Sequence, residues 1–213
     1  MKTDALINHL SESVAPVRAG AALRAIALGL AAGCAVSFAV MVAWLGIRPD
    51  LMTAMGTMAY WMKFFYTLLF AATGLWTLER LSRPGAASRT QMILEALPFA
   101  VLAAWSAMRL MMAPADTRMP MLMGSSHQVC PWRIVILALP IFVGVFWSLR
   151  RLAPTRPWIS GAAAGLLAGA AGAFIYAFHC DESAAAFVAL WYSIGITAVG
   201  ALGAVVGRLL LRW

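Results

Sequence analysis

The chain has 213 residues, of which 63% are hydrophobic and only 11% are charged. Soluble domains carry about 45–50% apolar and about 25% charged residues, so this chain has too little charge to cover a water-facing surface, and its composition also excludes disorder. The net charge of +8 would suit a nucleic-acid-binding protein, but the basic loops of a polytopic membrane protein produce the same excess. The positions of the basic residues therefore matter more than their sum.

Residues 1–24 form a polar segment with one amphipathic pattern. Its apolar residues recur at helical spacing: Leu6, Ile7, Leu10 and Val14. Pro16 ends the pattern, and a helix of three turns is marginal in water. Such a helix lies on a membrane or docks in the groove of a partner. Because Lys2 is the only Lys or Arg before Pro16, the pattern favours a protein partner over an anionic lipid surface.

Six apolar stretches follow, each a candidate transmembrane helix. A bilayer core of about 30 Å requires about 20 apolar residues per helix. The stretches lie at residues 25–47, 59–78, 92–113, 134–149, 158–178 and 187–206. The connectors are too short to hold a separate soluble domain. We therefore predict an all-α, polytopic membrane protein with a cytoplasmic segment at 1–24 and a six-helix transmembrane domain at 25–213.

The basic residues fall mostly in alternate connectors. If the N-terminus is cytoplasmic, the inner segments 1–24, 79–91, 150–157 and 207–213 hold eleven of the sixteen Lys and Arg residues. Because cytoplasmic loops carry the excess of Lys and Arg, this distribution predicts that both termini are cytoplasmic. The positive charge then reflects orientation in a lipid bilayer, and no direct contact with nucleic acid is expected.

Charged residues are rare inside the apolar stretches. Lys63, Glu95 and Arg109 lie near helix ends, where long charged side chains usually reach the interface, and we expect no acid at the midplane. This pattern disfavours a transporter. Cys34 follows a run that resembles a lipoprotein signal, but the apolar stretch continues to residue 47, as a spanning helix does.

Glycine residues recur at spacings of three or four in the last two stretches. They are Gly161, Gly165, Gly169 and Gly172 in one, and Gly200, Gly203 and Gly207 in the other. Such rows let helix backbones approach closely in lipid, so they predict helix packing within the chain or between chains. The oligomeric state is left open by this pattern.

Cys130 and Cys180 both face the outer compartment under this topology. Two histidines and two carboxylates accompany them in the sequence: His127, His179, Asp181 and Glu182. Thiolates, imidazoles and carboxylates suit a soft divalent ion such as zinc or cadmium. A structural disulfide between Cys130 and Cys180 and a reactive thiol pair are the alternatives. No other cofactor is expected, and the chain has no Cys-x-x-Cys motif of a thiol oxidoreductase.

The chain also resembles the NrsF family, named for a negative regulator of SigF. At the N-terminus the matching residues are Met1-Lys2-Thr3-Asp4, Leu6-Ile7, Leu10 and Pro16-Val17. Further along they are Cys130 ahead of Pro140, Leu149-Arg150-Arg151, Ala153-Pro154, the Gly-rich stretch, Tyr176, His179-Cys180, Trp191-Tyr192 and Leu211-Arg212-Trp213. The resemblance covers essentially the whole chain. It departs at Ser13, where the family commonly has an acidic residue.

The resemblance implies a six-helix anti-sigma factor of the bacterial inner membrane rather than an enzyme. Such a protein holds an extracytoplasmic-function (ECF) sigma factor inactive and releases it under metal or oxidative stress. Cys130 and Cys180 match the family's two sensing cysteines. The residues expected to bind the sigma factor are Asp4, Leu6, Ile7, Leu10 and Val14. A small-molecule or ion transporter and a quinone-linked thiol oxidoreductase are the competing hypotheses.

Overall fold

The structure, a computed structural model, describes residues 3–12, 20–83, 89–152 and 154–211. Every regular element in these ranges is a helix. In chain order they are α1 (Thr3–Glu12), α2 (Ala21–Trp44), α3 (Leu51–Ala54), α4 (Met58–Leu81), α5 (Arg89–Met112), α6 (Ala115–Met123), α7 (Cys130–Arg150), α8 (Pro157–Tyr176), α9 (Ala185–Phe187), η1 (Val188–Tyr192) and α10 (Ser193–Leu210). The all-helical prediction is confirmed for the described part of the chain.

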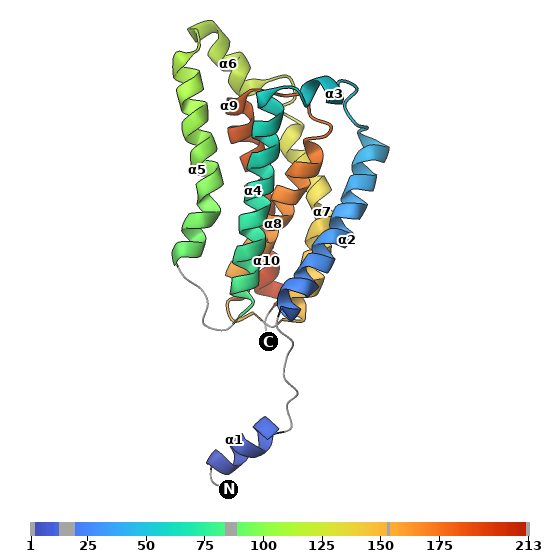
Figure 1. The fold of residues 1–213 in the computed structure, drawn as a ribbon, viewed down its shortest axis with the longest axis vertical. Coiled ribbons are helices and arrows are strands. Elements are labelled where there is room, and N and C mark those ends of the chain that lie inside the picture. The colour runs from blue at the N-terminus through green and yellow to red at the C-terminus, as the bar shows by residue number, and fades with distance from the viewer. Residues whose placement is uncertain (1–2, 13–19, 84–88, 153, 212–213) are drawn as a thin grey trace.

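The long helices run side by side as one bundle, with α8 at its centre (Figure 1). Most residues of α8 are buried, because alanine and glycine fill it and α2, α4, α7 and α10 all pack against it. The short helices α3 and α6 lie at one end of the bundle, and the C-terminus lies at the other (Figure 1). We call the first the α3–α6 end and the second the C-terminal end.

All six predicted stretches are helical, but five described segments are both long and apolar enough to cross a membrane. These are Ala21–Trp44, Ile93–Met112, Cys130–Arg150, Pro157–Tyr176 and Ala185–Leu210. The predicted second span corresponds to α4, which has 24 residues like α2. It carries Lys63, Glu79 and Arg80, so α4 is long enough to cross a membrane but is less apolar than the five candidate spans.

The two glycine rows pack against each other within the chain, one of the two arrangements that the sequence left open. A Cβ added at Gly161 of α8 would overlap the backbone of Gly203 in α10, and one added at Gly207 would overlap Gly161. The backbones of α8 and α10 thus meet without side chains between them. A similar contact joins Gly29 of α2 to Gly144 of α7. The sequence analysis did not single out that pair, although Gly29 and Gly33 are also four residues apart.

Lys63 and Glu95 lie near helix ends, as predicted, but their side chains are buried in the protein instead of reaching outward. Lys63 is 1% exposed and Glu95 is 8% exposed. Lys63 points to the segment after α8, where it bonds the carbonyls of Cys180 and Glu182, and Glu95 of α5 points toward Gly74 of α4. The third charge, Arg109, is exposed as expected.

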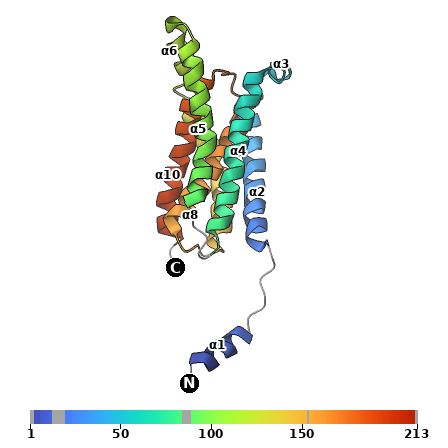
Figure 2. The ribbon, with the colours of Figure 1, turned by 60° about the vertical axis from the view of Figure 1, so that its left-hand side comes forward.

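Helix α1 stands apart from the bundle, beyond its C-terminal end (Figures 1 and 2). The side chain of Ile7 in α1 is 57% exposed, whereas isoleucine is among the residues most often buried in folded proteins. Several positively charged residues cluster at the same end of the bundle. They are Arg24, Arg80, Arg83, Arg150, Arg151, Arg156 and Arg208.

Candidate functional site

Cys130 and Cys180 meet at the α3–α6 end of the bundle. Cys130 is the first residue of α7, not a loop residue ahead of it as predicted, because Pro131 suits the first turn of a helix. Cys180 lies just after α8, where its backbone N–H donates to the Tyr176 carbonyl at 3.0 Å. Both cysteines are free and buried, with exposures of 0% and 2%. Their thiols are in direct contact.

Two basic side chains hold the segment that carries Cys180. The Lys63 ammonium donates to the carbonyls of Cys180 and Glu182, at 2.7 and 2.9 Å. The Arg48 guanidinium donates to the Cys180 carbonyl at 3.1 Å and is oriented by a two-pronged ion pair with Asp50. Residues from α4 and from the connector after α2 thus fix the backbone of Cys180.

The environment of Cys180 favours its thiolate form. The hydrogen bond donated by the Cys130 thiol lowers the pKa of Cys180, and the Lys63 ammonium adds to this effect. Burial acts in the opposite direction but is outweighed. A thiolate is the reactive form of cysteine toward both oxidants and metals. The pair therefore combines a reactive sulfur with a second sulfur in contact with it.

Tyr192 completes this cluster from the last membrane segment. Its ring is fully buried in the π-helical turn η1, and the Lys63 Nζ lies 5.9 Å from the ring centroid. Sequence reasoning missed Lys63 and Arg48 as site residues. Both residues are far from Cys180 along the chain, so sequence spacing does not connect them with it. The one available signal was the position of Lys63, a charged residue inside an apolar stretch.

Both ring nitrogens of His179 have hydrogen-bond partners within the protein. Its Nδ1 lies 3.0 Å from the Gly46 carbonyl, and its Nε2 lies 3.3 Å from Nη1 of Arg133. A guanidinium only donates, so Nε2 accepts from Arg133 and Nδ1–H donates to Gly46. This arrangement links the connector after α2, the segment after α8 and helix α7.

Glu182 holds the turn that precedes α7. Its Oε1 accepts from the backbone N–H groups of Ser125 and Ser126, at 2.6 and 3.1 Å, and from the Ser125 hydroxyl at 2.9 Å. His127 instead packs on Trp191, with ring centroids 5.5 Å apart, and Asp181 is exposed. Among the described residues, no three His, Cys, Asp or Glu side chains gather into a metal-binding group. The predicted ligand set His127, Cys130, His179, Cys180, Asp181 and Glu182 therefore shares one end of the bundle, while metal binding by it stays a prediction.

Removing the Lys63 charge is expected to raise the pKa of Cys180, because the ammonium favours the thiolate. In full-length Lys63→Met, the thiolate absorbance should develop at higher pH than in the parent protein, with Cys34 replaced by alanine in both. Arg109→Met is the matched control, since it removes an exposed charge at the same end of the bundle. An unchanged titration in Lys63→Met would contradict the proposed role of the ammonium.

The residues expected to bind a sigma factor lie in or after α1. Asp4, Leu6, Ile7 and Leu10 are in this helix, which confirms the helical part of the prediction. The structure describes the exposed side chain of Ile7 but not those of the other three. Val14 lies outside the described residues. The contact with a sigma factor stays a prediction.

Comparison with known proteins identifies relatives over the full length. The chain is 37% identical to "Anti-sigma-F factor NrsF" of Caulobacter vibrioides (strain NA1000 / CB15N) and 38% identical to "Probable anti-sigma-F factor NrsF" of Azospira oryzae (strain ATCC BAA-33 / DSM 13638 / PS), with 100% of both chains covered in each case. These relatives are named as regulatory proteins, not as enzymes. No solved structure matches the chain. The model of the NrsF family, described as "Negative regulator of sigma F", matches residues 10–213, and the chain therefore belongs to this family.

Proposed function

We propose that the chain is an anti-sigma factor of the bacterial inner membrane that sequesters an ECF sigma factor through α1. The names of the relatives supply the class of partner. The observation that carries the mechanism is α1 itself, an amphipathic helix that stands apart from the bundle. A sigma factor bound by α1 is kept at the membrane and away from RNA polymerase. The chain then regulates transcription without touching DNA.

The proposed topology has six spans, with both termini in the cytoplasm. Helix α4, the second long helix in chain order, is added to the five candidate spans, since its 24 residues extend about 36 Å and exceed a bilayer core of about 30 Å. Its charges are accommodated: Lys63 bonds the Cys180 segment, and Glu79 pairs with Arg83. The basic residues at the C-terminal end of the bundle support a cytoplasmic location for that end. Helix α1 is then cytoplasmic, where sigma factors are found.

The thiol pair is the proposed sensor at the opposite, periplasmic end. The support for it is the contact of two free cysteines, one of them with a lowered pKa. Two chemistries are open to the pair: oxidation to a disulfide, or capture of a divalent metal with help from nearby imidazoles and carboxylates. For the metal route, His179 and Glu182 would first have to leave their present hydrogen bonds.

The transmission of the signal is proposed to run through α7 and α8. Cys130 begins α7, and Cys180 follows α8, so a new bond between them acts on two packed helices. Both helices reach the C-terminal end of the bundle (Figure 1). A change in their packing there would alter the surface next to α1 and release the sigma factor.

The proposed function is tested by co-purification of the full-length chain from bacterial membranes. A tagged chain is expected to retain a sigma factor in unstressed cells and to lose it after stress. Mass spectrometry identifies the retained protein, and a chain lacking residues 1–12 is the control. Recovery of no sigma factor from unstressed cells, with the chain itself present in the membrane, would overturn the proposal.

A further inference from the structure

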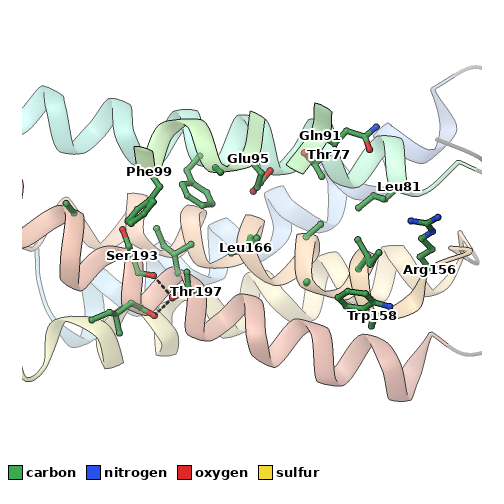
Figure 3. Close-up of a pocket in the computed structure, with 18 of the residues that line it drawn as sticks. Thr77, Leu81, Gln91, Glu95, Phe99, Arg156, Trp158, Leu166, Ser193 and Thr197 are labelled. Carbon is green, nitrogen blue, oxygen red and sulfur yellow. Dashed lines mark hydrogen bonds between the residues drawn. The ribbon is translucent and has the colours of Figure 1, made fainter. Parts of the chain in front are cut away.

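A large pocket lies between helices of the bundle, away from the cysteine pair, and it is open on one side, since Phe99 and Trp158 of its wall are exposed. It occupies about 790 Å³ between α4, α5, α8 and the segment Ala185–Leu210 (Figure 3). Its walls are mostly apolar and include Phe70, Phe99, Leu166 and Trp158. This volume falls in the range of about 300–1,000 Å³ that small-molecule sites occupy. The cavity is therefore large enough for a lipid-soluble ligand.

The wall of this cavity carries one acid, Glu95 of α5. Its side chain is 8% exposed, and neither carboxyl oxygen has a hydrogen-bond partner within the described part of the chain. Gly74 of α4 makes room for it, since a Cβ added there would lie 3.2 Å from Oε1 of Glu95. The Thr77 hydroxyl lies beside the carboxyl and is also unpartnered among the described residues (Figure 3).

The other hydroxyl groups of the cavity wall are satisfied by the protein. Ser193 shares a hydrogen bond of 2.7 Å with Tyr66, and the Thr197 hydroxyl donates to the Ser193 carbonyl at 2.7 Å. Among the described residues of the wall, the buried side-chain oxygens without a hydrogen-bond partner are those of Glu95 and Thr77. Leaving buried polar groups unpaired is unfavourable, and an acid within a membrane segment usually marks a functional site. Such a pair calls for a ligand that supplies the missing hydrogen bonds.

The available atoms fit a hydroxyl group. A hydroxyl donates one hydrogen bond, which Glu95 can accept, and its oxygen accepts one, which Thr77 can donate. An ammonium only donates, so it would leave the Thr77 hydroxyl proton without an acceptor. A phosphate beside Thr77 would be repelled by an ionised Glu95, and Arg156, a cation that also lines the pocket, lies apart from Glu95 at one end (Figure 3). We propose that this cavity binds a lipid-soluble alcohol or phenol, with its hydroxyl held by Glu95 and Thr77 and its apolar body against the walls.

The proposal is tested with two probes that differ in one hydrogen-bond donor, 4-nonylphenol and 4-nonylanisole. The full-length chain is placed in nanodiscs of phosphatidylethanolamine and phosphatidylglycerol, and binding is measured by native mass spectrometry. A buried hydrogen bond to a carboxyl group is expected to make the phenol bind at least about tenfold more tightly than the ether. Equal binding of the two probes, or binding of neither, would overturn the proposal.

Two variants locate the binding site. Glu95→Leu keeps the wall apolar and removes the acceptor, so the preference for the phenol is expected to disappear. Leu166→Trp fills the cavity and is expected to weaken both probes, whereas Leu68→Trp adds the same bulk on an exposed face of α4 and leaves binding unchanged. A phenol preference that survives in Glu95→Leu, or binding that survives in Leu166→Trp, would contradict the assignment. The outcome does not depend on sigma-factor binding, so it is separable from the proposed function.

Discussion

Replacing Cys130 or Cys180 with serine is expected to keep the sigma regulon at its uninduced level when cells meet cadmium, dichromate or peroxide. Each variant removes one sulfur of a contacting pair, so that neither a disulfide nor a two-thiolate metal site can form. Reporter transcription from a sigma-dependent promoter measures the effect. Because the proposed signal requires both sulfurs, either single variant should lose essentially the whole induction.

The chain supplies a matched control for this experiment. Cys34 lies in α2, is half-buried and does not belong to the pair, so Cys34→Ser should respond like the parent protein. Induction that is retained in both Cys130→Ser and Cys180→Ser would refute the sensor assignment. Western blots of membrane fractions verify that each variant is present at the parental level.

The chemistry of the response can be read on the protein itself. Peroxide converts two thiols to one disulfide and two molecules of water, with each thiol losing its hydrogen. Mass spectrometry of protein from peroxide-treated cells should then find a peptide in which Cys130 and Cys180 are joined. For cadmium, the cysteines should remain reduced, and the metal should co-purify with the parent chain but not with Cys180→Ser.

Charges placed on the apolar face of α1 are expected to make the sigma regulon constitutive. In the double variant Leu6→Asp, Leu10→Asp, two leucines that we assign to the partner's groove become acids. Burial of one leucine side chain contributes about 1.5–3 kcal/mol, so the loss of two weakens binding at least about a hundredfold. Sigma-dependent transcription in unstressed cells and co-purification with the full-length variant provide the two measurements.

Asn8→Asp is the control for charge in the same helix. Asn8 is exposed and lies outside the apolar pattern, so this variant should retain the sigma factor and low basal transcription. The double variant should still be found in the membrane, since the bundle begins only at α2. Undiminished co-purification of the double variant would show that α1 is not the docking element.

The apolar stretches and the glycine rows predicted the bundle well. Each stretch became a long helix, because about 20 apolar residues without a break have few alternatives to a helix in lipid. The glycine rows predicted close helix packing, but only the folded chain shows that Gly161 meets Gly203. Helices α3 and α6 were not predicted, since their sequences lack a clear apolar period. The sequence analysis also treated α4 as being as apolar as the other stretches, whereas it is less apolar than the five candidate spans.

The cysteine pair illustrates how far sequence spacing reaches. Two helices of about 20 residues joined by a short connector return to the same membrane surface, so the spacing predicted that Cys130 and Cys180 share one end of the bundle. It did not predict that the thiols touch, or that Lys63 and Arg48 hold the Cys180 carbonyl. Those contacts depend on the rotation of each helix about its axis.

Composition and local pattern were sufficient for the helical class, the number of apolar stretches, the uneven distribution of basic residues and the two candidate cysteines. These properties depend on residues that are near one another in the chain. The burial of Lys63 and the unpartnered carboxyl of Glu95 became visible only in the folded bundle. A charged residue in an apolar stretch faces lipid, interface or protein according to which neighbours pack against its helix. That choice is made by contacts between segments distant in sequence. Because of such contacts, Lys63 bonds the Cys180 carbonyl and Glu95 lies in the wall of the pocket.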